Sequence, residues 1–261
     1  MMKLPRLAVL ASALIVPVAD GEELVVAAPI ELAECAEALK SAFLADEKDT
    51  RLRFVMDASD ELYVKVSAGE PIDVYMSSDM RLQGQLLADG KMVYESWTMY
   101  ATGRIVLWSM DKRFDVRRGV PLLADPAVKK LALVNAGNAY LMPTYAALHY
   151  SGLLDKMQPR SLELDTMQDV VNAVRTNKAQ LAILSYETVL SAPMKGLGSY
   201  YLIPEPEYQD SVPGHAAVVT LHGKANPAAY RFIRFLRSAK AQAILVPKGF
   251  MKPPLKSVDV R

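Results

Sequence analysis

The feature that most constrains the fold is a regular alternation of strand-like and helix-like segments. Segments 23–28, 52–56 and 72–76 are short and apolar or alternating, as strands are, and helical patterns at 32–45, 59–68 and 81–88 follow them in turn. Strands that alternate with helices at this spacing predict βαβ units and a parallel sheet. A further strand is expected at 104–108.

The same pattern then restarts further along the chain. Strands are expected at 131–134, 181–184 and 216–221, and helices at 145–154, 167–177 and 227–245. Two consecutive α/β sheets predict two lobes with a cleft between them. In open parallel sheets, the loops after the strands and the N-termini of the following helices line such a cleft. Their free N–H groups and partial positive charge suit small polar ligands.

Composition excludes several classes of protein. The chain is 51% hydrophobic and 23% charged, which is incompatible with a disordered chain. The 30 Lys and Arg are balanced by 29 Asp and Glu, which argues against a nucleic-acid binder. A lone cysteine, Cys35, rules out an intramolecular disulfide and a site made of several thiolates.

The first 19 residues have the pattern of a secretory signal peptide. Lys3 and Arg6 precede an apolar run of about ten residues, and Ala19 follows as a small residue at its end. The run is too short to cross a bilayer, which needs roughly twenty apolar residues. We therefore predict cleavage after Ala19 and export to the periplasm, with an N-terminal membrane anchor as the alternative.

From about Leu24 to Phe250 the chain resembles the periplasmic molybdate-binding proteins of ABC importers. The resemblance rests on the order and spacing of four segments, at 27–28, 68–77, 124–132 and 226–250. It implies a two-lobed periplasmic-binding-protein fold of the α/β class, in which each lobe is a mixed, mostly parallel sheet flanked by helices. It also implies that residues 20–103 and 213–261 form lobe 1 and that residues 104–212 form lobe 2.

The resemblance further implies a ligand site, and here the sequence departs from the family pattern. The family holds molybdate with uncharged donors, including serines after the first two strands and a tyrosine after a late strand. In this chain the first serine is missing, Ser59 is flanked by acids, and Ser185 stands where the tyrosine is expected. The expected ligand contacts are Pro29, Ile30, Glu31, Asp57, Ser59, Asp60, Tyr140, Leu141, Met142, Tyr145, Ser185, Tyr186 and Glu187.

These substitutions leave two ligand classes open. A carboxylate within about 5 Å of a dianion repels it by several kcal/mol at an intermediate dielectric, and four of the expected contacts are acids. Asp57 and Asp60 could instead cap a helix and point away. The apolar and aromatic contacts suit a larger apolar or lipid-like organic molecule, although they could also belong to the core. A molybdate- or tungstate-type oxyanion is the ligand that the resemblance implies.

Other chemistry finds little support. The three histidines, His149, His215 and His222, match no metal motif and are expected to be surface or hydrogen-bonded structural residues. We therefore predict no metal, no cofactor and no enzymatic activity. The prediction is a monomeric solute-binding protein that closes by a hinge and delivers a small molecule or oxyanion to an inner-membrane transporter. The alternatives are an exported enzyme that uses Asp60 and Glu187, and a ligandless envelope subunit.

Overall fold

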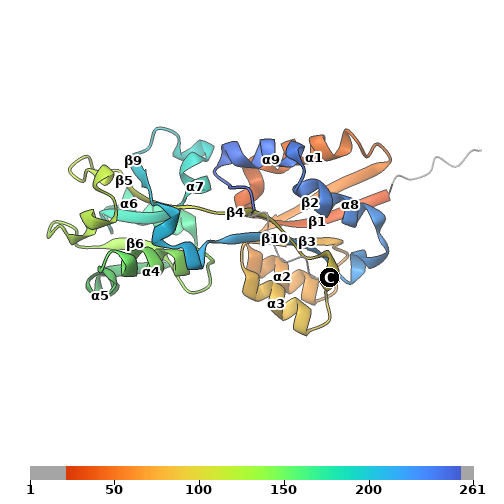
Figure 1. The fold of residues 1–261 in the computed structure, drawn as a ribbon, viewed down its shortest axis with the longest axis horizontal. Coiled ribbons are helices and arrows are strands. Elements are labelled where there is room, and N and C mark those ends of the chain that lie inside the picture. The colour runs from red at the N-terminus through yellow and green to blue at the C-terminus, as the bar shows by residue number, and fades with distance from the viewer. Residues whose placement is uncertain (1–21, 254–261) are drawn as a thin grey trace, which may run out of the picture.

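The computed structural model describes residues 22–253, so the predicted signal peptide lies outside the described residues. Two five-stranded sheets lie side by side along the long axis of the molecule (Figure 1). We call the part of the chain around each sheet the first lobe and the second lobe. The prediction of an α/β fold with two lobes, each a mixed sheet flanked by helices, is confirmed.

The first sheet has the order β2-β1-β3-β10-β4. β1 pairs in parallel with β2 and β3, whereas β10 runs antiparallel to β3 and β4. The strands are β1 (Glu22–Pro29), β2 (Thr50–Asp57), β3 (Val74–Ser77), β4 (Thr98–Thr102) and β10 (Gly214–Val219).

The second sheet has the order β7-β6-β8-β5-β9. β6 pairs in parallel with β7 and β8, and β5 runs antiparallel to β8 and β9. The strands are β5 (Ile105–Ser109), β6 (Leu131–Val134), β7 (Ser161–Leu164), β8 (Leu181–Ser185) and β9 (Ser199–Leu202).

Helices cover both faces of the first sheet (Figure 1). Alternate residues of β1 face opposite sides, as the period of two in a strand requires. Leu24 and Val26 pack in the core beneath α1, α8 and α9, and Val25 and Ala27 pack in the core beneath α2 and α3. The helices are α1 (Ala33–Leu44), α2 (Ser59–Ser67), α3 (Met80–Ala88), α8 (Pro227–Leu236) and α9 (Ala239–Leu245).

The second lobe has one continuous core, to which every strand of its sheet except the edge strands contributes fully buried residues. Its helices are α4 (Leu141–Tyr150), α5 (Leu154–Met157), α6 (Met167–Arg175) and α7 (Tyr186–Leu190). Among residues 22–253, no helix combines the length and apolar character needed to span a bilayer.

The structure corrects two predicted helices. The expected helix at 227–245 is two helices, because the Ser238 side chain accepts a hydrogen bond from the Ala241 N–H and starts α9 anew. The expected helix at 145–154 begins earlier, at Leu141, and ends at Tyr150. Pro143 lies in its first turn, where proline removes no intrahelical hydrogen bond.

The chain passes between the two sheets twice. β4 ends at Thr102 and β5 begins at Ile105, and the chain returns between Leu202 and Gly214. The two passages are joined by a hydrogen bond of 2.8 Å from the Gly103 N–H to the Pro213 carbonyl. The domain limits expected at 103/104 and 212/213 stay a prediction.

Candidate functional site

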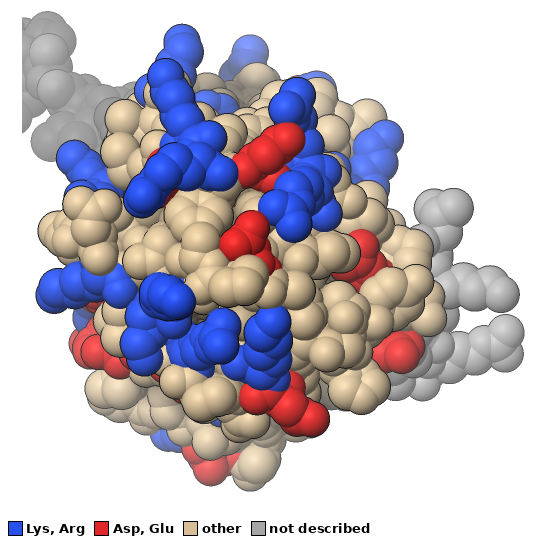
Figure 2. All heavy atoms as spheres, turned by 90° about the vertical axis from the view of Figure 1, so that its left-hand side faces the viewer, with Lys and Arg blue, Asp and Glu red and all other residues tan. Residues whose placement is uncertain are grey.

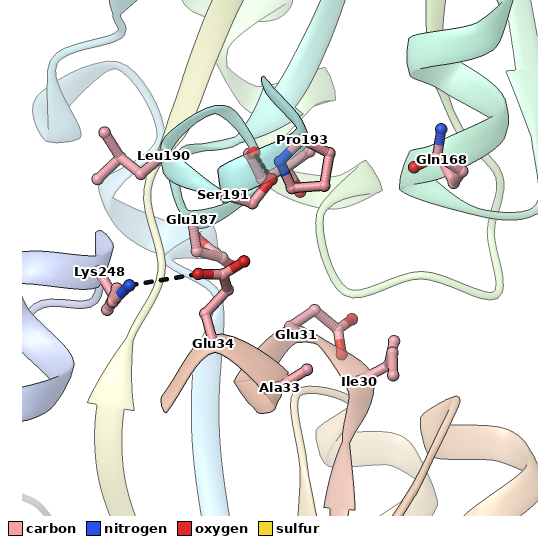
Figure 3. Close-up of a pocket in the computed structure, with 11 residues that line it drawn as sticks. Ile30, Glu31, Ala33, Glu34, Gln168, Glu187, Leu190, Ser191, Pro193 and Lys248 are labelled. Carbon is pink, nitrogen blue, oxygen red and sulfur yellow. Dashed lines mark hydrogen bonds and ion pairs between the residues drawn. The ribbon is translucent and has the colours of Figure 1, made fainter. Parts of the chain in front are cut away.

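A pocket of about 300 Å³ lies between the two lobes (Figure 3). The first lobe contributes the short 3-10 helix Ile30–Leu32, the start of α1, and a lysine near the C-terminal end of the described chain. The second lobe contributes α7, the turn after it, and one residue of α6. The lining residues are Ile30, Glu31, Ala33, Glu34, Gln168, Glu187, Thr188, Leu190, Ser191, Pro193 and Lys248.

Two buried strands position the main walls of this pocket. β1 is buried from Leu24 to Pro29, and the chain then turns directly into the 3-10 helix that carries Glu31. On the other side, β8 ends at the buried Ser185, whose Oγ accepts a hydrogen bond from the Thr188 N–H at 3.3 Å. This N-cap starts α7 immediately after the strand, so that Glu187 lies in its first turn at the pocket.

Glu31 and Glu187 are the chemically distinctive residues of the pocket. In each, Oε2 is buried and has no hydrogen-bond partner. Burial raises the pKa of Glu187 to about 7, and the nearby Glu31 carboxyl adds to the rise. Burial also raises the pKa of Glu31. An unpartnered buried carboxyl oxygen costs free energy, so this pair favours a ligand that donates hydrogen bonds to it or is positively charged.

Glu187 also belongs to a buried polar cluster that joins the lobes. The Tyr140 hydroxyl donates to Glu187 Oε1 and lies 3.0 Å from His215 Nε2. Tyr140 precedes α4 in the second lobe, and His215 lies in β10 of the first. Burial lowers the pKa of His215 to about 4, so the imidazole is neutral near pH 7. Its Nδ1 has no hydrogen-bond partner.

Glu34 forms a second contact between the lobes at the rim of the pocket. Its Oε1 accepts a hydrogen bond of 3.2 Å from the Ala192 N–H in the second lobe. Its Oε2 lies 3.3 Å from Lys248 Nζ in the first lobe (Figure 3). Glu34 therefore links the two lobes through Oε1, and the ion pair of Oε2 with Lys248 fixes the orientation of its side chain.

The variant Glu34→Ala is expected to favour a more open arrangement of the lobes. Small-angle scattering should show a larger radius of gyration than for the unmodified protein. Lys248→Ala is the matched control, because it removes the ion pair within the first lobe and keeps the Ala192 N–H contact between lobes. Equal radii for Glu34→Ala and the unmodified protein would contradict this role.

The structure brings three of the predicted contacts to the pocket and places two beside it. Ile30, Glu31 and Glu187 line it. Tyr140 is buried behind it against Glu187, and Ser185 is buried beneath α7 as its N-cap.

The other predicted contacts lie elsewhere in the structure. Leu141 and Pro29 are buried, and Tyr186 packs against the Arg104 guanidinium, whose carbon lies 4.4 Å from the ring centroid. Met142 and Tyr145 line a different hollow of about 470 Å³ on the second lobe. The remaining three, at the start of α2, are Asp57, Ser59 and Asp60.

The start of α2 does not follow the helix-capping alternative. The N-cap residue is Ala58, which has no side-chain cap. Asp57 instead accepts from its neighbour's N–H and from Lys65 Nζ at 2.7 Å, and these hydrogen bonds lower its pKa. Asp60 is exposed, and the Ser59 hydroxyl is buried without a partner. Lys65 thus offsets the Asp57 charge, and the acidic character of the site resides in Glu31 and Glu187.

Several lining residues were not predicted from the sequence. Thr188, Leu190, Ser191 and Pro193 belong to α7 and its following turn, a helix too short to give a periodic pattern. Lys248 is distant in sequence, and only the fold brings it to Glu34. No group of His, Cys, Asp and Glu within residues 22–253 is arranged to hold a metal ion.

Two α/β lobes joined by two passages, with a pocket between them, define the class of two-lobed solute-binding proteins. The model of the family described as bacterial extracellular solute-binding protein matches residues 24–251. This chain belongs to that family of solute-binding transport proteins. The resemblance to the periplasmic molybdate-binding proteins of ABC importers is confirmed.

Individual relatives agree with this assignment. The chain is 26% identical to the molybdate-binding protein ModA of Azotobacter vinelandii, over 84% of this chain and 90% of the relative. It is 23% identical to ModA of Rhodobacter capsulatus, over 91% of both chains. The substrate-binding domain of a putative molybdenum ABC transporter from Clostridium difficile superposes with a TM-score of 0.73 at 19% identity, covering 89% of this chain and 99% of that one.

Proposed function

We propose that this protein is exported to the periplasm, captures a solute in the pocket between its lobes, and delivers it to the membrane component of an ABC transporter. Family membership supports solute binding and transport. The pocket between lobes joined by two passages supports capture by hinge closure. Both lobes supply lining residues, so a bound solute would stabilise the closed arrangement.

We further propose that the solute is an organic molecule with a cationic or hydrogen-bond-donating group. The observation that carries this proposal is the pair of unpartnered buried carboxyl oxygens on Glu31 and Glu187. A donor or cation would pair with them, whereas a dianion would lose several kcal/mol wherever either carboxyl is ionised. Ile30, Leu190 and Pro193 offer apolar surface for the rest of the solute.

A molybdate-type oxyanion is the second candidate, and the names of the curated relatives favour it. Molybdate would bind here only with both carboxyls protonated, when they could donate hydrogen bonds. The raised pKa of Glu187, about 7, makes that form accessible at mildly acidic pH. Affinity for molybdate would then fall as the pH rises through 7.

Calorimetry with molybdate distinguishes the two candidates. No heat of binding at pH 8 is expected, because Glu187, whose pKa is about 7, is then mostly charged. Native mass spectrometry of the protein purified from its own host is expected to detect a bound organic molecule, and Glu31→Gln should reduce its occupancy. The matched control is Asp60→Asn, since Asp60 is exposed and outside the pocket. Nanomolar to micromolar molybdate binding at pH 8 would refute the organic-solute proposal.

A further inference from the structure

The end of the second lobe that lies farthest from the first lobe has a distinct charge. This surface, which we call the basic end, consists of the loops at residues 110–130, 155–160, 175–180 and 195–198. Strand pairing places these loops together, because Leu131 is opposite both Leu181 and Ser161, and Ser109 is opposite Ser199. The Gln180 side chain ties two of the loops by accepting from the Lys129 and Lys130 N–H groups, each at 2.9 Å.

Lys and Arg cover much more of the basic end than Asp and Glu do (Figure 2). Three of its four acids, Asp111, Asp115 and Asp125, each pair with an arginine of the same surface, and the fourth, Asp155, is exposed. Its lysines are exposed, and none of them forms an ion pair with another residue of the range 22–253. These lysines are Lys112, Lys129, Lys130, Lys156, Lys178 and Lys195.

The other acids of the second lobe lie toward the opposite ends of the same strands. In β8, for example, Leu181 adjoins the basic end and Ser185 adjoins the pocket, a separation of roughly 13 Å. Because the whole chain is almost neutral, with 30 basic and 29 acidic residues, the basic end reflects segregation of charge and not an excess. The acids outside the basic end are Glu163, Asp165, Asp169, Glu187, Glu205, Glu207 and Asp210.

We infer that the basic end binds the anionic phospholipid headgroups of a membrane surface. Six of the eight basic residues of this surface for which no ion pair is formed within residues 22–253 are lysines, the others being Arg160 and Arg175. Lysine acts as a flexible point charge without the fork geometry that fits one defined phosphate. Such a diffuse surface matches a diffuse layer of negative charge, and each lysine near an anionic lipid surface strengthens binding roughly fivefold. This inference rests on the proposed function, in which the protein delivers its solute at a membrane surface and its basic end would meet such a layer.

Vesicle co-sedimentation of the full chain tests this inference. The protein is expected to bind vesicles of equal parts phosphatidylglycerol and phosphatidylcholine, and not vesicles of phosphatidylcholine alone. Binding should disappear near 1 M salt, where the screening length is about 3 Å. The triple variant Lys112→Glu, Lys129→Glu, Lys130→Glu should weaken binding by at least about 100-fold, because losing three lysines gives a fivefold factor for each and the new carboxylates add repulsion.

A matched variant controls for net charge. Lys48→Glu, Lys224→Glu, Lys252→Glu makes the same change in total charge at exposed positions of the first lobe, and it should bind anionic vesicles nearly as well as the unmodified protein. The inference would be overturned if both triple variants weakened binding equally. It would also be overturned if the protein did not bind anionic vesicles, or bound neutral vesicles equally well. Retention on immobilised polyglutamate without vesicle binding would overturn it in favour of an acidic protein partner. Thermal unfolding checks that both variants fold.

Discussion

Replacing Glu187 with glutamine is expected to remove a pH-dependent loss of stability of about 3 kcal/mol. The pKa of Glu187 is raised from 4.5 to about 7 in the folded protein, chiefly by burial. Between these two values the folded state holds a proton that the unfolded state has released, so the contribution of Glu187 to stability is full below pH 4.5 and is lost as the pH rises to 7. Each pKa unit corresponds to about 1.4 kcal/mol.

The measurement is the free energy of unfolding by urea, taken from pH 4.5 to 8 for both proteins. The free energy of unfolding of the unmodified protein, minus that of Glu187→Gln, should fall by about 3 kcal/mol as the pH rises from 4.5 to 7 and should then stay constant. Glu31 is present in both proteins, so its own titration largely cancels. A difference that does not vary with pH would show that the Glu187 carboxyl is not buried as described.

His215 supplies a control of opposite sign. Burial lowers its pKa from 6.5 to about 4, so the unfolded state binds a proton that the folded state lacks between these values. The contribution of His215 to stability is present above pH 6.5 and is lost as the pH falls to 4. The free energy of unfolding of the unmodified protein, minus that of His215→Gln, should therefore rise by about 3 kcal/mol from pH 4 to 6.5. In the unmodified protein the free energy of unfolding falls with pH because of Glu187 and rises with pH because of His215. These two pH dependences oppose each other, so the comparison with each variant is needed to separate them.

The second large effect is expected at Gly103, in the passage from β4 to β5. A Cβ at this position would lie 2.3 Å from the Tyr140 hydroxyl oxygen, well inside contact distance. Tyr140 is buried and hydrogen-bonded to Glu187, so its ring has little room to move. Gly103→Ala is expected to lower the free energy of unfolding by about 2 kcal/mol, as overpacking of a filled interior does.

A double-mutant cycle with Tyr140→Phe tests the cause of this effect. Removing the hydroxyl eliminates the closest clash, so Gly103→Ala should cost about 1 kcal/mol less in the Tyr140→Phe background than in the unmodified protein. Denaturant unfolding of the four proteins measures this coupling. Additive effects of the two substitutions would mean that the glycine is required for another reason, such as backbone flexibility at the passage between the lobes.

Much of the fold could be predicted from periodicity, because its central strands are buried. Strands β1, β6 and β8 have continuous apolar sequences, and α2 and α6 have clear helical patterns. The missed strands, β4, β7 and β9, lie at sheet edges. β7 and β9 are four residues long and only partly buried, so their sequences carry little apolar signal. The short α7 was missed because one turn and a half cannot show a period.

The site was predictable only where it follows a buried strand. Glu31 and Glu187 were found because the family resemblance implied ligand contacts just after the first strand and after a late strand, and each residue lies just after such a strand. Lys248 and Gln168 reach the pocket through tertiary contacts that no local pattern reports. His215, expected to be a surface or structural histidine, is fully buried against Tyr140. Its position inside an otherwise apolar strand could have predicted that His215 is buried. Its partner Tyr140, in the other lobe, can be identified only from the fold.

The second sheet is built from one uninterrupted stretch of chain whose two ends meet. Val106 near the start of β5 is opposite Leu202 at the end of β9, so this stretch leaves and rejoins the rest of the molecule at neighbouring points. A single genetic exchange of residues 105–202 would therefore replace one entire wall of the pocket without touching the other. Inheritance of this kind offers a route by which related transport systems could acquire new nutrients in one step.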